Sequence, residues 1–252
     1  MDNLVAVMDF SGAYGKESFY RRIPHLRIDC TGMEGVKGYC SAESEKRLRG
    51  IVREHGKCGV HFIDSGSYHY LSKLWIEETV PGNIRYNLLL IDHHPDTKKP
   101  ELGNILSCGS WAGDLVMSSG NLGTLYILGV DDGYAEDEIP KDWVKSGKVR
   151  ICPESSGNDA VLRFMDEINS TSLPLYLSVD KDVLSSNEII TDWDNGSMRL
   201  ESLTALLSSI GRKPLGIDVC GECTHVYPSE RDCFNAHSRV NESILKALKL
   251  YP

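Results

Sequence analysis

Short apolar runs alternate along this chain with segments whose apolar residues recur at helical spacing. The apolar runs predict strands at 3–9, 60–63, 87–91, 124–130, 148–152, 173–179 and 214–219, with a possible strand at 26–28. Helical spacing predicts helices at 44–55, 71–75, 161–168, 200–210 and 240–248. A loop leading into a short helix is expected within 109–119, and the rest of 11–42 allows no assignment.

Strands that alternate with helices in this way are typical of an α/β protein with parallel strands. A chain of 252 residues is long enough for one large domain of this kind and short for two. We therefore predict a three-layer α/β/α sandwich with a central, mostly parallel sheet, built as a single domain over residues 1–252.

Charge and composition narrow the choice of function. The formal net charge of −9 argues against general nucleic-acid binding, which needs a basic face. The sequence has no apolar run long enough to span a membrane, and its N-terminal segment lacks the features of a signal peptide. We expect a cytoplasmic protein whose eight cysteines are free thiols.

The stretch 87–96 combines a buried strand with candidate metal ligands. An unbroken apolar run is typical of a strand that is buried on both faces, and here Asp92, His94 and Asp96 follow it directly. Residues two apart on an extended chain point the same way, so these three side chains are expected to meet. The carboxyl edge of a parallel sheet is also where such folds place their sites.

Two further strand ends carry the same kinds of side chain. His69 follows the strand at 60–63, and Asp180 and Asp182 follow the strand at 173–179. Four carboxylates at one sheet edge need a cation, because each disfavours the ionisation of the others. A carboxylate-rich set with few imidazoles suits Mn²⁺, and six ligands exceed the three of a catalytic zinc. Two ions, which together activate water, fit this count.

Three motifs, at 66–69, 92–96 and 178–182, resemble in type and order those of the arginase-like ureohydrolases. The resemblance implies the parallel-sheet sandwich predicted above, a small-molecule substrate and a possible homo-oligomer. It also implies a reaction in which a hydroxide bridging two Mn²⁺ attacks a guanidino or imino carbon and breaks a C–N bond. One ion would be bound by His69, Asp92, Asp96 and Asp180, and the other by Asp92, His94, Asp180 and Asp182, with Asp96, Asp182 and Glu222 as the catalytic residues.

The chain departs from the family pattern in places that concern the substrate. The family's arginine-hydrolysing members carry a histidine in the loop after the second motif, whereas 107–111 has none and is more similar to the formimidoylglutamase branch. Tyr68 and His93 replace an acidic residue and an alanine. Glu222, the expected contact for a cationic substrate, lies four residues after Asp218 where the family has three. A guanidino and a formimino substrate therefore both stay open.

Other interpretations of these motifs are open. The Asp92-His93-His94 triplet also resembles the DHH phosphoesterases, which want an Asp-x-Asp motif before it, and a ureohydrolase fold that holds metals without catalysis is a third option. Cys220, Cys223, His225, Cys233 and His237 could form a zinc or redox site, but ordinary thiols in a loop are favoured.

The sequence also predicts where four further side chains lie. Lys181 should point away from the aspartates beside it, because successive side chains of an extended chain alternate. Cys108 is expected in the wall of a pocket and His61 in the core. Trp111 is expected either at the mouth of the site or in the core.

Overall fold

An eight-stranded parallel sheet forms the centre of the protein. The computed structural model describes residues 4–100, 103, 105–224 and 230–251. The sheet order is β2-β1-β4-β10-β9-β5-β7-β8, and each neighbouring pair is parallel. The strands are β1 (Val5–Asp9), β2 (His25–Asp29), β4 (Val60–Phe62), β5 (Tyr86–Ile91), β7 (Leu122–Leu128), β8 (Val149–Cys152), β9 (Leu175–Asp180) and β10 (Ile217–Cys220).

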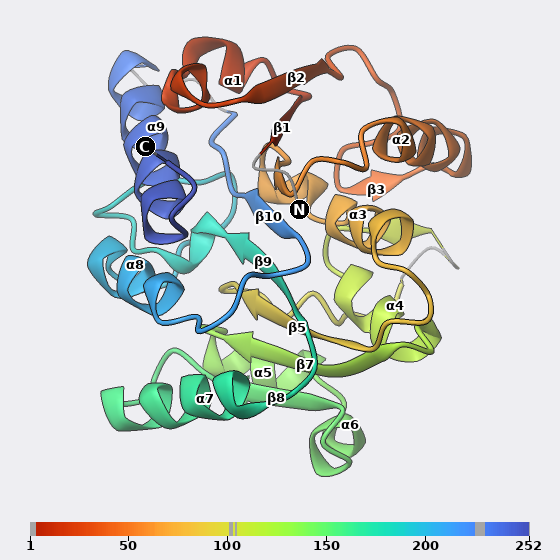
Figure 1. Cartoon of the computed structure of the whole chain (residues 1–252), viewed down its shortest axis with the longest axis vertical. Coiled ribbons are helices and arrows are strands. Elements are labelled where there is room, and N and C mark those ends of the chain that lie inside the picture. The colour runs from red at the N-terminus through yellow and green to blue at the C-terminus, as the bar shows by residue number, and fades with distance from the viewer. Residues whose placement is uncertain (1–3, 101–102, 104, 225–229, 252) are drawn as a thin grey trace.

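Helices cover both faces of this sheet, which explains the unbroken apolar run of β5. Leu88 and Leu90 pack into the core on one face, whereas Leu89 and Ile91 pack into the core on the other. The first face is covered by α2 (Ala42–Glu54), α3 (Leu71–Thr79) and α4 (Trp111–Ser118), and the second by α7 (Asn158–Ser170), α8 (Leu200–Ser208) and α9 (Glu230–Ala247) (Figure 1). The predicted three-layer α/β/α sandwich is confirmed, with a sheet that is entirely parallel.

The sequence pattern missed several short elements. The unassigned stretch 11–42 contains α1 (Ala13–Lys16), the 3-10 helix η1 (Phe19–Arg22) and β3 (Tyr39–Cys40), which pairs with β6 (Leu106–Ser107) in a small antiparallel sheet. Two further helices are α5 (Asp132–Glu138) and α6 (Lys141–Lys145). Helix α5 begins after Asp131, whose carboxylate caps it by accepting hydrogen bonds from the backbone N–H groups of Gly133 and Tyr134.

Four adjacent strands in the middle of the sheet, β4, β10, β9 and β5, end at the same edge. Parallel strands bring the segments that follow them together at this edge, so His69, Asp92 and Asp180 become neighbours although they are far apart in sequence. Among the described residues, no helix is both long and apolar enough to cross a bilayer. The extent of the domain over 1–252 stays a prediction.

Candidate metal centre

The side chain of His69 is surrounded by three aspartates. Its Nδ1 atom lies 3.2 Å from Asp92 Oδ2, 3.0 Å from Asp96 Oδ2 and 3.6 Å from Asp180 Oδ2. All four side chains are buried. His69, Asp92 and Asp96 each offer one ligand atom, and these three atoms lie within 4.8 Å of one another, as a shared metal ion requires.

A second group of the same kind shares one aspartate with the first. His94 Nδ1 lies 3.0 Å from Asp182 Oδ2 and 3.7 Å from Asp92 Oδ1. His94, Asp92 and Asp182 also bring their ligand atoms within 4.8 Å of one another. The two oxygens of Asp92 therefore face different histidines, which is the arrangement that a carboxylate bridging two ions would need.

The electrostatics of these groups fit divalent cations. Asp92 Oδ2 is buried and accepts no hydrogen bond from the described residues, and an unsatisfied buried carboxylate oxygen is costly. Burial and the neighbouring Asp92 raise the pKa of Asp182 to about 7. Burial alone would lower the pKa of His69, but its contacts with Asp92 and Asp96 raise it well above the ordinary value. A carboxylate-rich donor set that is short of positive charge fits two hard divalent ions.

We expected an extended chain to bring these side chains together, but the backbone does so by turns. The His94 N–H donates to Asp92 Oδ1 at 2.7 Å, so the chain turns as soon as β5 ends. Asp96 has a φ of +50°, which is uncommon for a residue other than glycine. Its carbonyl accepts hydrogen bonds from the N–H groups of Ala112 and Gly113 at the start of α4, which hold this conformation.

Asp180 and Asp182 are likewise arranged by a local turn. Asp182 lies in the 3-10 helix η3 (Lys181–Val183), where its N–H donates to Asp180 Oδ1 at 3.0 Å. Its own Oδ1 accepts from the His93 N–H at 3.2 Å, which joins the segment after β9 to the segment after β5. The prediction that Lys181 points away from the two aspartates is confirmed, since its Nζ binds Glu222 on the other side.

Three residues that hold the candidate ligands were not assigned this role from sequence. Ser178 Oγ lies 2.9 Å from His69 Nε2, which leaves Nδ1 to face the aspartates. Trp111 donates its Nε1–H to Asp96 Oδ2 at 2.5 Å and is fully buried, so it belongs to the core and also touches the site. Asp194 Oδ1 lies 3.0 Å from His94 Nε2. Partners on the far nitrogen of a metal-binding histidine fix its orientation.

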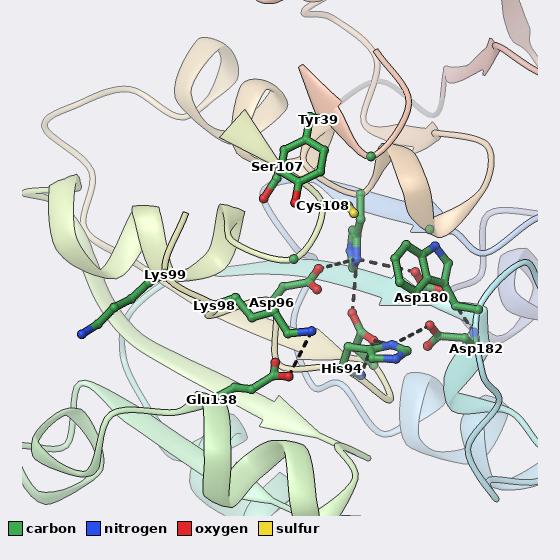
Figure 2. Close-up of a pocket in the computed structure, with 16 residues that line it drawn as sticks. Tyr39, His94, Asp96, Lys98, Lys99, Ser107, Cys108, Glu138, Asp180 and Asp182 are labelled. Atoms are coloured by element: carbon green, nitrogen blue, oxygen red, sulfur yellow. Dashed lines mark hydrogen bonds and ion pairs between the residues drawn. The ribbon is translucent and has the colours of Figure 1, made fainter. Parts of the chain in front are cut away.

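A cavity of about 190 Å³ opens above these ligands. Figure 2 shows Asp96, Asp180, Asp182 and His94 gathered at one end of this cavity, with Lys98 reaching toward Glu138 at its side and Lys99 pointing away. Lys98 Nζ pairs with Glu138 Oε1 at 3.1 Å. The other lining residues include Tyr39, Ser107 and Trp193. The cavity is large enough for a small molecule and contains both signs of charge.

Cys108 lines this cavity, as expected for a residue of its wall. Burial and the nearby Asp96 raise the pKa of its thiol to about 12. A thiol with such a pKa stays protonated at neutral pH and is a poor nucleophile. The absence of a histidine from 107–111 thus leaves uncharged side chains on this wall.

Glu222 lies elsewhere than we expected. Its side chain is 1% exposed, is not among the residues that line the cavity, and accepts a hydrogen bond from Lys181 Nζ. His237 Nδ1 lies 2.8 Å from the other oxygen of Glu222, and Asn241 donates to the first at 2.8 Å. Since its charge is already balanced by Lys181, Glu222 is not placed to contact a cationic substrate in the cavity.

The remaining expectations concern His61 and the cysteines. His61 is a core histidine, bound to Asp218 at 2.6 Å and stacked on Trp75. Cys220 lies beside Asp180, and its Sγ is 3.0 Å from Asp180 Oδ2. Cys223 is buried and Cys233 is half-buried. His225 lies outside the described residues, so the proposed grouping of these thiols with it stays untested.

Comparison with known proteins places this geometry in a structural class. No family model and no curated protein sequence matches the chain. Solved structures do match, including a hypothetical agmatinase from Burkholderia thailandensis (14% identity, 97% of this chain and 84% of that one, TM-score 0.70). The formimidoylglutamase of Bacillus subtilis is similar too (16% identity, 99% and 87%, TM-score 0.69).

A formiminoglutamase variant from Trypanosoma cruzi, solved with Mn²⁺, matches at 12% identity over 99% of this chain and 94% of that one, with a TM-score of 0.66. The fold of the chain is therefore that of the arginase-like ureohydrolases. This confirms, at the level of the fold, the resemblance carried by the three sequence motifs. The identities of 12–16% limit this likeness to the fold.

Proposed function

We propose that this protein is a metal-dependent hydrolase that cleaves a linear C–N bond in a small guanidino or formimino compound. The observation that carries the proposal is the convergence of His69, His94 and three aspartates into two groups that share Asp92, with a fourth aspartate, Asp180, beside His69. Asp92 Oδ2, which faces His69 and accepts no hydrogen bond from the described residues, supports a bound cation on that side. We propose two Mn²⁺ as the ions, and the Mn²⁺ in the T. cruzi neighbour supports this choice.

A bound pair of divalent ions would supply Lewis acidity and lower the pKa of water at this site. The chain's own residues would then hold and orient the reactants. Asp92 and Asp180 would each serve both ions, while Asp96 and Asp182 line the cavity and would act as the catalytic aspartates, Asp96 holding the ion beside His69 and Asp182 the ion beside His94. We assign Glu222 no contact with the substrate, because Lys181 already binds its carboxylate.

The charge of the cavity lining favours substrates that carry a carboxylate. Lys98 contributes a cationic group to the lining, only partly neutralised because its side chain is 52% exposed beside Glu138. A substrate with a carboxylate at the end opposite its guanidino or formimino group would match this charge. A guanidino compound that ends in an amine would place like charge near Lys98.

The test is a screen of guanidino and formimino compounds, with and without a terminal carboxylate, for release of urea, ammonia or formamide in the presence of Mn²⁺. The control is Asp182→Ala, which removes a proposed ligand. Turnover by the wild type and its loss in Asp182→Ala would support the proposal. Equal behaviour of the two proteins would favour a metal-binding protein without catalysis. This alternative is suggested by Glu222, which binds Lys181 and does not line the cavity. Phosphate release from phosphodiesters would favour the phosphoesterase interpretation.

A further inference from the structure

A cysteine reaches the same group of ligands from a strand that carries no motif. Cys220 is the last residue of β10, and its side chain is 1% exposed. Its Sγ donates to Asp180 Oδ2 at 3.0 Å. One ligand atom each from His69, Asp180 and Cys220 lies within 4.8 Å of the other two. The sulfur thus lies within reach of an ion that His69 and Asp180 would share.

The fold holds Cys220 in this place. Strands β9 and β10 pair in parallel with Cys220 opposite Asp180, so the two residues end their strands at the same height. The next residue, Gly221, has a φ of +88°, and a Cβ at this position would lie 2.4 Å from Asp180 Oδ1. Only glycine lets the chain pass so close to Asp180. The close approach of β10 is therefore built into the sequence at this position.

We propose that Cys220 is a ligand of the ion on the His69 side, as a thiolate beside His69, Asp92, Asp96 and Asp180. The inference rests on the proposed function only in assuming that an ion binds there. On binding, the S–H proton now donated to Asp180 Oδ2 would pass to solvent, and a metal–sulfur bond would replace the S–H bond. No electron is transferred.

A sulfur donor changes which metals this side of the centre prefers. Thiolates favour softer ions such as Zn²⁺ and Co²⁺, whereas a site made only of carboxylates and histidine accepts Mn²⁺ readily. Within the described part of the chain, the ligand group that contains His94 has nitrogen and oxygen donors only. The two halves of the centre are thus chemically unequal, and the His69 side should discriminate against Mn²⁺ more strongly than the His94 side.

The experiment uses Co²⁺, which gives a thiolate-to-metal charge-transfer band in the near ultraviolet when sulfur is bound. The full-length metal-free protein is titrated with Co²⁺, and the spectra of wild type, Cys220→Ser and Cys108→Ser are compared. Cys108 is the matched control, because it is a thiol that lines the cavity beside the ligands but belongs to no ligand group found among the described residues. We expect the band in wild type and Cys108→Ser and its loss in Cys220→Ser.

Competition between Zn²⁺ and Mn²⁺ provides the second measurement. Loss of the sulfur should reduce the preference for Zn²⁺ by at least about tenfold in Cys220→Ser. Cobalt uptake by the wild type without a charge-transfer band would overturn the inference and leave the proposed function standing, because Cys220 would then only donate its S–H to Asp180. A band that disappears in Cys108→Ser would overturn it as well. A wild type that takes up no Co²⁺, Zn²⁺ or Mn²⁺ would overturn both proposals.

Discussion

Two polar clusters lie on opposite sides of the segment that follows β9, and they differ in how the charge of their buried carboxylates is balanced. The carboxylate cluster consists of His69, Asp92, His94, Asp96, Asp180 and Asp182. The lysine cluster consists of Glu17, Lys181, Glu222, His237 and Asn241. One chain segment supplies both, because Lys181 stands between Asp180 and Asp182 and points the opposite way.

The lysine cluster contains its own cation. Burial alone would raise the pKa of Glu222, but Lys181 and His237 hold it far below its ordinary value. In the carboxylate cluster four aspartates face two histidines, and burial together with Asp182 raises the pKa of Asp180. Burial and the Glu222 charge raise the pKa of Glu17 within the lysine cluster as well, so the two clusters differ in whether a buried ammonium group lies among the carboxylates. The comparison teaches that burial alone does not indicate a metal site, and that a shortage of positive charge does.

The largest effect is expected from breaking the lysine cluster. Lys181→Met leaves the Glu222 carboxylate buried without its ammonium partner, which should lower the free energy of unfolding by about 3–5 kcal/mol. Urea denaturation of the metal-free protein measures this. The double variant Lys181→Met/Glu222→Gln should recover part of the loss, because it removes the unpaired charge. An unchanged urea midpoint in Lys181→Met would contradict the view that this cluster is self-contained.

The carboxylate cluster should instead respond to added ions. Saturation with Mn²⁺ at about 100 times its dissociation constant should stabilise the wild type by about 2.7 kcal/mol. Asp182→Asn should lose most of this gain, because it removes a ligand oxygen from the His94 group. Asp194→Asn should lose a smaller part of the gain, since Asp194 contacts only the far nitrogen of His94 and is half-exposed. Thermal unfolding with and without Mn²⁺ measures the gain, and a gain of equal size in Asp182→Asn would contradict the assignment.

The sequence predicted the sheet and the convergence of the six side chains because both follow from strand order and from where apolar runs end. It could not predict the lysine cluster, since Glu222 meets Lys181 and Asn241 through contacts between β10, β9 and α9 that no local pattern records. The motif resemblance pointed Glu222 toward the substrate, but the glutamate is displaced by one position and Gly221 stands where the family has its glutamate. The sequence pattern placed Cys220 in a loop, whereas it is the last residue of β10. Its position directly after the predicted strand at 214–219 could have indicated a side chain at the carboxyl edge of the sheet.

A smaller effect is expected in the pH dependence of the stability of the metal-free protein, which depends on the carboxylate cluster. Burial and Asp92 raise the pKa of Asp182 to about 7 in the folded state, against about 3.9 in the unfolded state. The stabilisation from its protonated form is complete below pH 4 and is lost as the pH rises to 7. His94, despite its burial, has a raised pKa through Asp182 and Asp92, so its contribution is also lost at higher pH.

We therefore expect the metal-free wild type to lose on the order of 1–2 kcal/mol between pH 5.5 and 7.5, relative to Asp182→Asn. Urea denaturation of both proteins across this range measures the difference. Since metal binding needs deprotonated ligands, stabilisation by Mn²⁺ should grow over the same interval. Parallel stability curves for the two metal-free proteins would contradict the proposed role of Asp182 in this pH dependence.

The smallest effect is expected where a core residue supports the carboxylate cluster. Trp111→Phe keeps the ring in the core but removes the hydrogen bond from its Nε1–H to Asp96 Oδ2. We expect the affinity for Mn²⁺ to fall about tenfold, which is typical when a partner of a metal ligand is lost. Trp75→Phe is the matched control, because Trp75 is equally buried on the same face and its Nε1 has no hydrogen-bond partner among the residues that the structure describes. If both variants bind Mn²⁺ as the wild type does, Trp111 acts in packing alone, and Asp96 is held by its backbone contacts with α4.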